Sequence, residues 1–264
     1  MTFKLGMPTL IEKDSIEENV ILCNELGLDF VELNMNLPYC MPNSNSPEEL
    51  LRMKEKYNIE FTLHFPEEID FACFYEEIRQ ANISLFQYIA TWASKFGVEK
   101  INIHLNPGVY FTLPHKKMFV YDKNKELFME KFKDSLCKIV KIASPLGIKV
   151  CIENMQVHSF IESTFKDLCE VSEAHFTWDV GHDAAAGYKI EKIYSKYPHK
   201  VSHMHLHDYN GTSDHQILFD GHIPIRDRIK FAKDNDLSVV LETKTVDALK
   251  ESVKRLKESD NILF

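Results

Sequence analysis

The chain has 264 residues, of which 44% are hydrophobic and 27% are charged. This composition is typical of a folded globular protein and excludes long disordered or low-complexity regions. The net charge of −9 argues against a broad basic surface, and so disfavours nucleic acid or an anionic membrane as the main partner.

Short apolar segments alternate with longer amphipathic ones along the chain. In chain order, strands are predicted at residues 3–8, 30–34, 60–65, 100–105, 149–154, 176–180, 201–208 and 238–242. Apolar residues at helical spacing fill the intervals, and Gly27, Gly97 and Gly147 stand where a helix should end before the next strand.

Strands that alternate with helices usually form a parallel sheet with right-handed crossovers. Eight such units of about 33 residues predict an α/β protein with a single (β/α)8 TIM barrel, in one domain over residues 1–264. A doubly wound open sheet is the main alternative, but no GxGxxG motif follows the first strand.

Nearly every predicted strand has one apolar face and one face that ends in a histidine or a carboxylate. In residues 100–105, for example, Ile101 and Ile103 oppose Asn102 and His104. The polar groups lie at the carboxyl ends of the strands, where barrel active sites are built. Burying them without partners would be costly, whereas a metal ion neutralises carboxylates and accepts neutral imidazole.

We therefore predict a divalent metal site formed by Glu153, Asp179, His205 and Glu242. His64 and His104 are further candidate ligands. Glu32 is expected to contact substrate or support the site, and His203 to lie deeper. The four-residue set suits Mn²⁺, Co²⁺, Mg²⁺ or Zn²⁺, and additional histidine ligands would favour Zn²⁺.

Several segments resemble known sequences. Residues 178–188 (WDVGHDAAAGY) resemble the D-x-x-H-x-x-x-A-G-Y segment of endonuclease IV-like apurinic endonucleases. Residues 203–208 (HMHLHD), with the following Gly211, Asp214-His215 and residues 220–223, resemble the seventh-strand region of the xylose isomerase-like barrel superfamily. Residues 152–154 (IEN) and 241–243 (LET) are similar to its fifth- and eighth-strand motifs. That superfamily contains sugar and sugar-phosphate isomerases and epimerases, inosose dehydratases and endonuclease IV.

The resemblance implies that the four predicted ligands hold the shared metal of the superfamily, with one ion at that site. In the endonucleases, the positions of His64 and His104 bind a second metal, and those of His182 and His215 bind a third together with an aspartate. That aspartate falls on Ser213 here, with Asp214 one place along, which counts against a third metal.

In the sugar epimerases, the position of His182 instead contacts substrate, and His207 and His215 are further candidates for such contact. Those enzymes often carry an arginine in the loop after the seventh strand. None lies between Asp208 and Ile225, which counts against the epimerase pattern of substrate contacts.

Three functions are compatible with these residues. The favoured one is a metal-dependent isomerase or epimerase of a sugar, sugar phosphate or related polyol or keto compound. Glu153 and Glu242 would act as its catalytic base and acid, moving a proton through a metal-bound enediolate. The alternative is a zinc-dependent phosphodiesterase of the endonuclease IV kind. The third is a metal-binding or sugar-binding barrel that has lost its activity. The intact pair of Glu153 and Glu242 argues against this function.

The phosphodiesterase is disfavoured because DNA binding needs phosphate contacts from Lys and Arg. The chain has five arginines, and Glu67, Glu68 and Asp70 follow His64 closely. The loop at residues 108–122 is an exception to this scarcity of basic residues, because it contains both basic and aromatic side chains. It is predicted to be a lid, a partner surface, or a segment packed on its own helix.

The remaining features concern location and assembly. Residues 1–13 lack a signal-peptide pattern, no apolar run is long enough to cross a membrane, and the six cysteines form no CxxC pair. We therefore expect a cytoplasmic protein with reduced thiols and a carbohydrate-like small-molecule substrate. The oligomeric state stays open, with a weak preference for a homo-oligomer.

Overall fold

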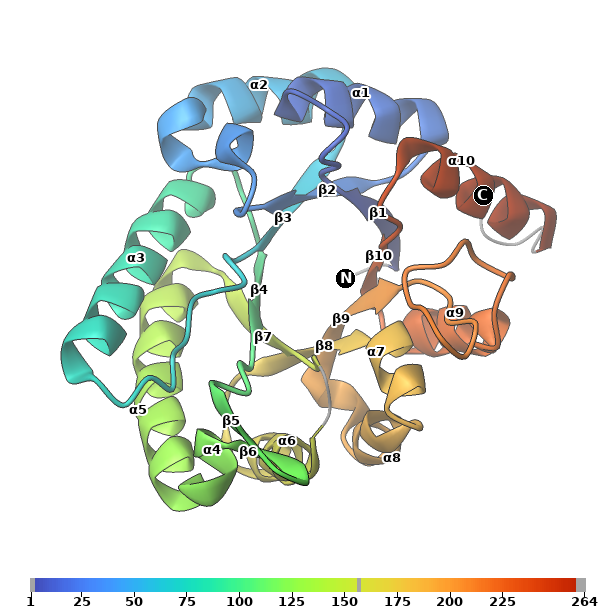
Figure 1. Ribbon diagram of the computed structural model, residues 1–264. Helices are drawn as coiled ribbons and strands as arrows, with labels where there is room; N and C mark the ends of the chain where they lie inside the picture. The colour runs from blue at the N-terminus through green and yellow to red at the C-terminus, as the bar shows by residue number, and fades with distance from the viewer. Residues whose placement is uncertain (1–2, 156–157, 260–264) are drawn as a thin grey trace.

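The computed structural model describes residues 3–155 and 158–259, in which eight parallel strands close into a barrel. The strands are β1 (Lys4–Pro8), β2 (Phe30–Asn34), β3 (Glu60–His64), β4 (Lys100–His104), β7 (Lys149–Glu153), β8 (His175–Asp179), β9 (Val201–Leu206) and β10 (Ser238–Leu241). Figure 1 shows them as a ring, in which β1 pairs with both β2 and β10 and so closes the barrel. The predicted (β/α)8 barrel is confirmed.

Helices surround the strands, as Figure 1 also shows. They are α1 (Ile16–Leu26), α2 (Pro47–Tyr57), α3 (Glu76–Ser94), α4 (Val120–Lys123), α5 (Lys125–Ala143), α6 (Ser159–Val171), α7 (Val180–Ala185), α8 (Lys189–Tyr194), α9 (Ile225–Asp234) and α10 (Val246–Ser259). Single 3-10 turns lie at Pro38–Cys40, Pro42–Ser44, Ser144–Leu146 and Pro198–Lys200. Among the described residues, no helix is long and apolar enough to cross a membrane.

Local sequence signals begin and end these helices. At the start of α1 the Ser15 side chain accepts a hydrogen bond from the backbone N–H of Glu18, and Gly27 ends the helix with φ of 68°. At α2, Ser46 and Glu49 satisfy each other's backbone N–H groups in a capping box. These contacts explain why both helices begin where the sequence pattern changes.

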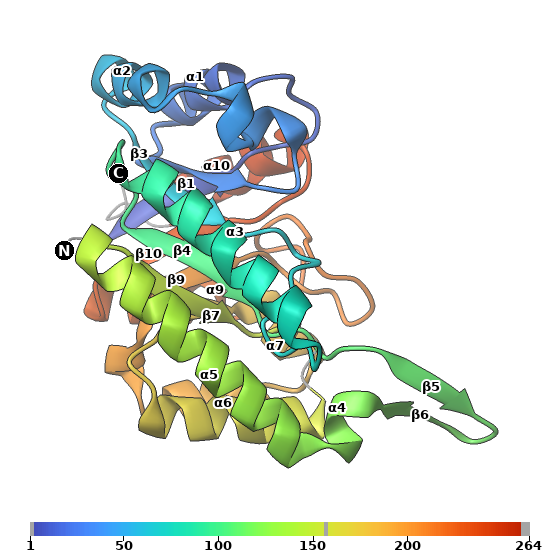
Figure 2. The same cartoon turned by 90° about the vertical axis from the view of Figure 1, so that its left-hand side faces the viewer.

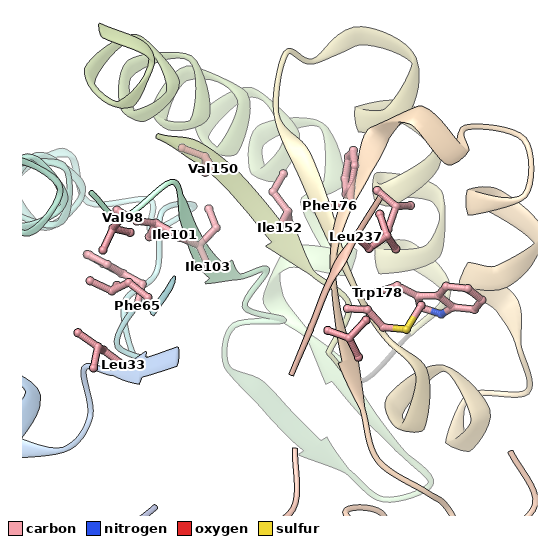
Figure 3. Close-up of a cluster of buried hydrophobic side chains, with 14 of the residues drawn as sticks. Leu33, Phe65, Val98, Ile101, Ile103, Val150, Ile152, Phe176, Trp178 and Leu237 are labelled. Atoms are coloured by element: carbon pink, nitrogen blue, oxygen red, sulfur yellow. The ribbon is translucent and has the colours of Figure 1, made fainter. Parts of the chain in front are cut away.

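The apolar faces of the strands form the core between barrel and helices. Ile101, Ile103, Val150 and Ile152 are at most 3% exposed, and Figure 3 shows them in one cluster with Phe176. The opposite faces of these two strands, β4 and β7, point into the barrel and end in His104 and Glu153. The fold therefore gathers the polar faces of its strands around one axis, as their alternation predicts.

Residues 108–122, expected as a loop, contain regular secondary structure. They contain an antiparallel hairpin of β5 (Tyr110–Leu113) and β6 (Lys116–Phe119), which projects away from the barrel in Figure 2. At its base Phe119 packs against Phe160 of α6, and Tyr121 stacks on Phe128 of α5, the loop's own helix, which fits the packed alternative. Phe111, farther out, is 66% exposed. The strand-forming residues of β5 pair here with the neighbouring segment β6, a local contact that barrel periodicity does not reveal.

Candidate active site

Four predicted metal ligands meet at the carboxyl end of the barrel. Glu153 and Asp179 end β7 and β8, His205 lies near the end of β9, and Glu242 directly follows β10. His205 Nδ1 lies 3.3 Å from Glu153 Oε1 and 3.2 Å from Glu242 Oε2. One potential ligand atom from each of the four residues lies within 4.8 Å of all the others. The fold thus brings these four side chains together.

The donor set has the chemistry of a divalent-cation site. It combines three carboxylates with one imidazole, almost fully buried. His205 Nδ1 and Glu242 Oε2 are buried, yet neither makes a hydrogen bond within the described part of the chain. Burial opposes protonation of His205, but Glu153, Glu32 and Glu242 raise its pKa well above the usual value. A bound divalent ion would relieve this excess of negative charge and occupy the unpaired atoms.

His64 and His104 extend the same cluster. The Nε2 atoms of both rings lie 3.4 Å from Glu153 Oε2 and 3.0 Å from each other. The Nδ1 of His64 is 2.9 Å from the backbone oxygen of Phe65, which favours a proton on Nδ1 and leaves Nε2 as the site-facing nitrogen. Glu153 therefore presents one oxygen to the four-residue cluster and the other to this histidine pair.

A third group of side chains lies beside Asp179. His182 Nδ1 is 3.2 Å from Asp179 Oδ2, and its Nε2 is 3.6 Å from Asp214 Oδ2. The His182 and His215 rings are 5.6 Å apart between centroids. Asp214 thus supplies a carboxylate beside His182, although the position matched by the endonuclease motif is Ser213.

Two residues position Asp179. Asn154 donates from Nδ2 to the Asp179 backbone oxygen and accepts from its N–H, at 2.8 and 2.9 Å. His207 Nδ1 accepts the backbone N–H of His215 at 2.8 Å, so its proton belongs on Nε2, which lies 3.1 Å from Asp179 Oδ1. Both ring nitrogens of His207 are therefore engaged, and the ring is fully buried.

Glu32 lies beneath the cluster and supports it. Its Oε1 is 2.9 Å from His205 Nε2, and its Oε2 is 2.9 Å from His203 Nε2. Thr62 Oγ1 donates to the same Oε2 at 3.1 Å. Burial opposes ionisation of Glu32, but His205 and His203 hold its pKa well below the usual value. The contact of Nε2 with Glu32 directs Nδ1 of His205 toward the site.

Gly181 leaves the space that the His207 ring occupies. A Cβ atom added at Gly181 would lie 1.9 Å from His207 Cε1, which no side-chain adjustment of alanine could relieve. We expect Gly181→Ala to displace His207, loosen Asp179 and weaken metal binding by about 10- to 100-fold. Titration of the metal-free variant with Zn²⁺ or Mn²⁺ measures this effect. Unchanged affinity would show that His207 does not position Asp179.

An open pocket of about 380 Å³ adjoins Glu242 at the same end of the barrel. Asn34, Glu67, Glu68 and Lys244 contribute to its lining. Lys244 Nζ lies 2.8 Å from Glu242 Oε1, a contact that the sequence pattern missed although Lys244 is only two residues along. The sequence pattern does not reveal the role of Asn154 either, because that role depends on hydrogen bonds to the Asp179 backbone on the neighbouring strand.

Solved structures of sugar epimerases have the same fold. The structure of a D-tagatose 3-epimerase-like protein matches with a TM-score of 0.80 and 21% identity, covering 97% of this chain and 96% of that chain. The structure of a 3-keto-D-glucoside 4-epimerase from E. coli matches with a TM-score of 0.78 and 16% identity, covering 97% and 99%. A structure described as IOLI protein with a bound zinc atom matches with a TM-score of 0.73 and 16% identity, covering 97% and 96%.

Comparisons of sequence extend over nearly the whole chain. An uncharacterized protein of Methanocaldococcus jannaschii is 26% identical over 268 aligned residues, which cover 97% of this chain and 98% of the relative. The family described as xylose isomerase-like TIM barrel matches residues 20–259. The resemblance noted in the sequence is thereby confirmed: the chain belongs to the xylose isomerase-like TIM barrel family.

Proposed function

We propose that the chain is a divalent-metal-dependent isomerase or epimerase of a carbohydrate-like small molecule. The observation that carries this proposal is the convergence of Glu153 and Glu242 on His205 Nδ1, beside an open pocket at the carboxyl end of the barrel. Membership of the family and the shared fold of sugar epimerases support it.

Glu153, Asp179, His205 and Glu242 would hold the ion, and the chemistry of this donor set fits a divalent metal. When bound, the ion would polarise a substrate carbonyl and acidify the proton on the neighbouring carbon. The structure with a bound zinc atom supports a metal in this fold. The identity of the metal depends on how many of the other histidines take part.

Glu153 and Glu242 would move the proton from opposite sides of the substrate carbon, through an enediolate. Glu242 presents Oε2 to His205, while its Oε1 is the oxygen beside Lys244 at the pocket. We propose Glu242 Oε1 as the atom that exchanges a proton with substrate on this side. Glu153 would act on the other side, with His64 and His104 next to its Oε2.

The remaining predicted residues divide into two groups. His182 is partly exposed and beside Asp179, where it would orient a substrate hydroxyl or stabilise developing negative charge. His215 lies next to it. His207 was expected to contact substrate, and Glu32 to contact substrate or support the site. Because they are fully engaged with His205, His203 and Asp179, we propose that they position the ligands instead.

Solvent-hydrogen exchange tests the proposal. In D₂O, wild-type enzyme with added metal should place deuterium on the carbon next to the carbonyl of a substrate drawn from free ketoses and ketose phosphates. We expect Glu242→Gln to slow this exchange by at least about 100-fold, because the amide cannot accept the proton. Glu48→Gln, on the exposed start of α2, is the matched control and should exchange at the wild-type rate. Undiminished exchange in Glu242→Gln would remove Glu242 from the proton transfer.

A zinc-dependent phosphodiesterase is the second candidate, and the specific observation in its favour is that two of the three further candidate metal clusters contain the histidines matched to the additional metals of the endonucleases. They are formed by His64, His104 and Glu153, and by His182, His207 and His215. Against it, Glu67 and Glu68 line the mouth of the site, where they would repel a phosphate backbone. Cleavage of a DNA duplex at an abasic position, with two or three zinc ions per chain, would favour this candidate over the isomerase.

A further inference from the structure

The opposite end of the barrel carries a basic cluster that the proposed reaction does not use. Lys100, Lys149 and His175 are the first residues of β4, β7 and β8. Alternation along each strand puts them on the same inner face as His104, Glu153 and Asp179, four residues later. Lys100 and Lys149 are direct neighbours in the register of β4 and β7. Three basic side chains therefore gather at the amino end of the barrel interior.

The positive charge of this cluster has little compensation. Lys100 is 6% exposed, and its Nζ donates to the Ser202 backbone oxygen at 2.9 Å and to Ser238 Oγ at 2.6 Å, both of which are neutral. Neither Lys100 nor Lys149 forms an ion pair within residues 3–155 and 158–259. The nearby carboxylate of Glu60 is paired with Lys4, and Glu99, whose charge also acts on Lys100, forms no ion pair with a described residue. A buried ammonium without a counter-ion is unfavourable and attracts an anion.

The titration behaviour of the cluster agrees with this geometry. Burial lowers the pKa of Lys100 to about 8. Burial, together with the charges of Lys149, Lys200 and Lys100, lowers the pKa of His175 to about 4. Both shifts have the direction expected for basic groups in a poorly solvated space. Because His175 is neutral near pH 7, the positive charge of the cluster comes from Lys100 and Lys149.

A pocket of about 250 Å³ lies against these side chains. Lys100, Lys149 and His175 line it from the strands, and His199 lines it from the turn before β9. Asp236 is the single carboxylate in its described lining, and it forms no ion pair with another described residue. The pocket is large enough for a phosphate group and has donors on several sides.

We propose that this basic pocket, formed by Lys100, Lys149, His175 and His199, binds inorganic phosphate or a phosphate monoester. Ammonium groups bind phosphate oxygens through charge-assisted hydrogen bonds, which are stronger than bonds between neutral groups. The ligand would supply the negative charge that the barrel lacks at this end. It would also stabilise the folded chain in proportion to its concentration and affinity. This site is independent of the proposed reaction.

Titration of the full, metal-loaded chain with inorganic phosphate, followed by ¹H–¹⁵N NMR, tests the proposal. Saturable shifts are expected at the backbone amides of Lys149, His175 and Val201, which lie at this end of the barrel. Shifts at Glu153 or Asp179 would report phosphate at the other end, so the two sites are distinguished. A parallel titration with glucose 6-phosphate compares a phosphate monoester with inorganic phosphate. The compound with the lower dissociation constant is the preferred ligand.

Two variants decide whether the basic residues form the site. Lys149→Gln should weaken the phosphate response by about tenfold or more, because one charge-assisted contact is lost. His199→Gln, at an exposed rim position, is the second variant if Lys149→Gln does not fold, and it should also weaken binding. Lys250→Gln, on the exposed face of α10, is the charge-matched control and should leave the response unchanged. No saturable shift at this end with either ligand, or an equal response in all variants, would overturn the proposal.

Discussion

Glu153→Gln is expected to lower turnover by about 10³-fold or more and to reduce the metal content of the purified chain. The reason is that Glu153 serves two clusters at once. Its Oε1 lies 3.3 Å from His205 Nδ1, and its Oε2 lies 3.4 Å from the Nε2 atoms of His64 and His104. The amide has nearly the same shape but cannot carry the charge or accept the proton. Steady-state rates and elemental analysis of the same preparation measure the two effects.

The two measurements separate the roles of Glu153. Loss of turnover with normal metal content would assign Glu153 to proton transfer alone, and loss of both would assign it to the metal as well. Glu48→Gln should change neither, since this side chain is exposed on α2. Full activity and full metal content in Glu153→Gln would contradict the central role given to this residue.

Glu32→Ala is expected to destabilise the metal-free fold by about 3–5 kcal/mol, because it leaves two buried histidines without their shared partner. Both oxygens of Glu32 lie 2.9 Å from histidine nitrogens, one on His203 and one on His205. Metal binding should also weaken by about 10- to 100-fold, since Glu32 directs Nδ1 of His205 into the site. Urea unfolding of metal-free protein measures the first effect, and metal titration measures the second.

Glu25→Ala provides the matched control for this experiment. Glu25 is exposed on α1, so its replacement should change the free energy of unfolding by no more than about 0.5 kcal/mol. A similarly small change in Glu32→Ala would show that the Glu32–histidine contacts contribute little to stability. If metal affinity were also unchanged, Glu32 would not position His205.

The barrel and the grouping of its polar residues could be predicted because both depend on short-range patterns. The alternation in residues 100–104 places Asn102 and His104 opposite Ile101 and Ile103, and most of the other barrel strands repeat this pattern. Once eight such strands close around one axis, the polar strand ends must meet. The neighbourhood of Glu153, Asp179, His205 and Glu242 follows from that closure.

Contacts between loops and between distant strands could not be predicted in the same way. The approach of Asp214 to His182 depends on the path of the loop after β9, which has no periodic pattern. The role of His207 depends on a hydrogen bond from the His215 backbone, and the role of Lys100 on Ser238, which is 138 residues away. The hairpin of β5 and β6 arises from local pairing outside the barrel. The spacing of residues in the sequence does not determine these contacts.

The metal content of the chain, purified without added metal, tests the central claim most directly. We predict about one divalent ion per chain in the wild type and a large loss in Asp179→Asn. Asparagine keeps the side-chain oxygen that accepts the His182 N–H at the start of α7, so the variant should fold. Asp247→Asn, exposed on α10, should retain the wild-type content. A wild-type chain that binds no divalent metal, or an Asp179→Asn variant that binds it as tightly, would contradict the proposed site.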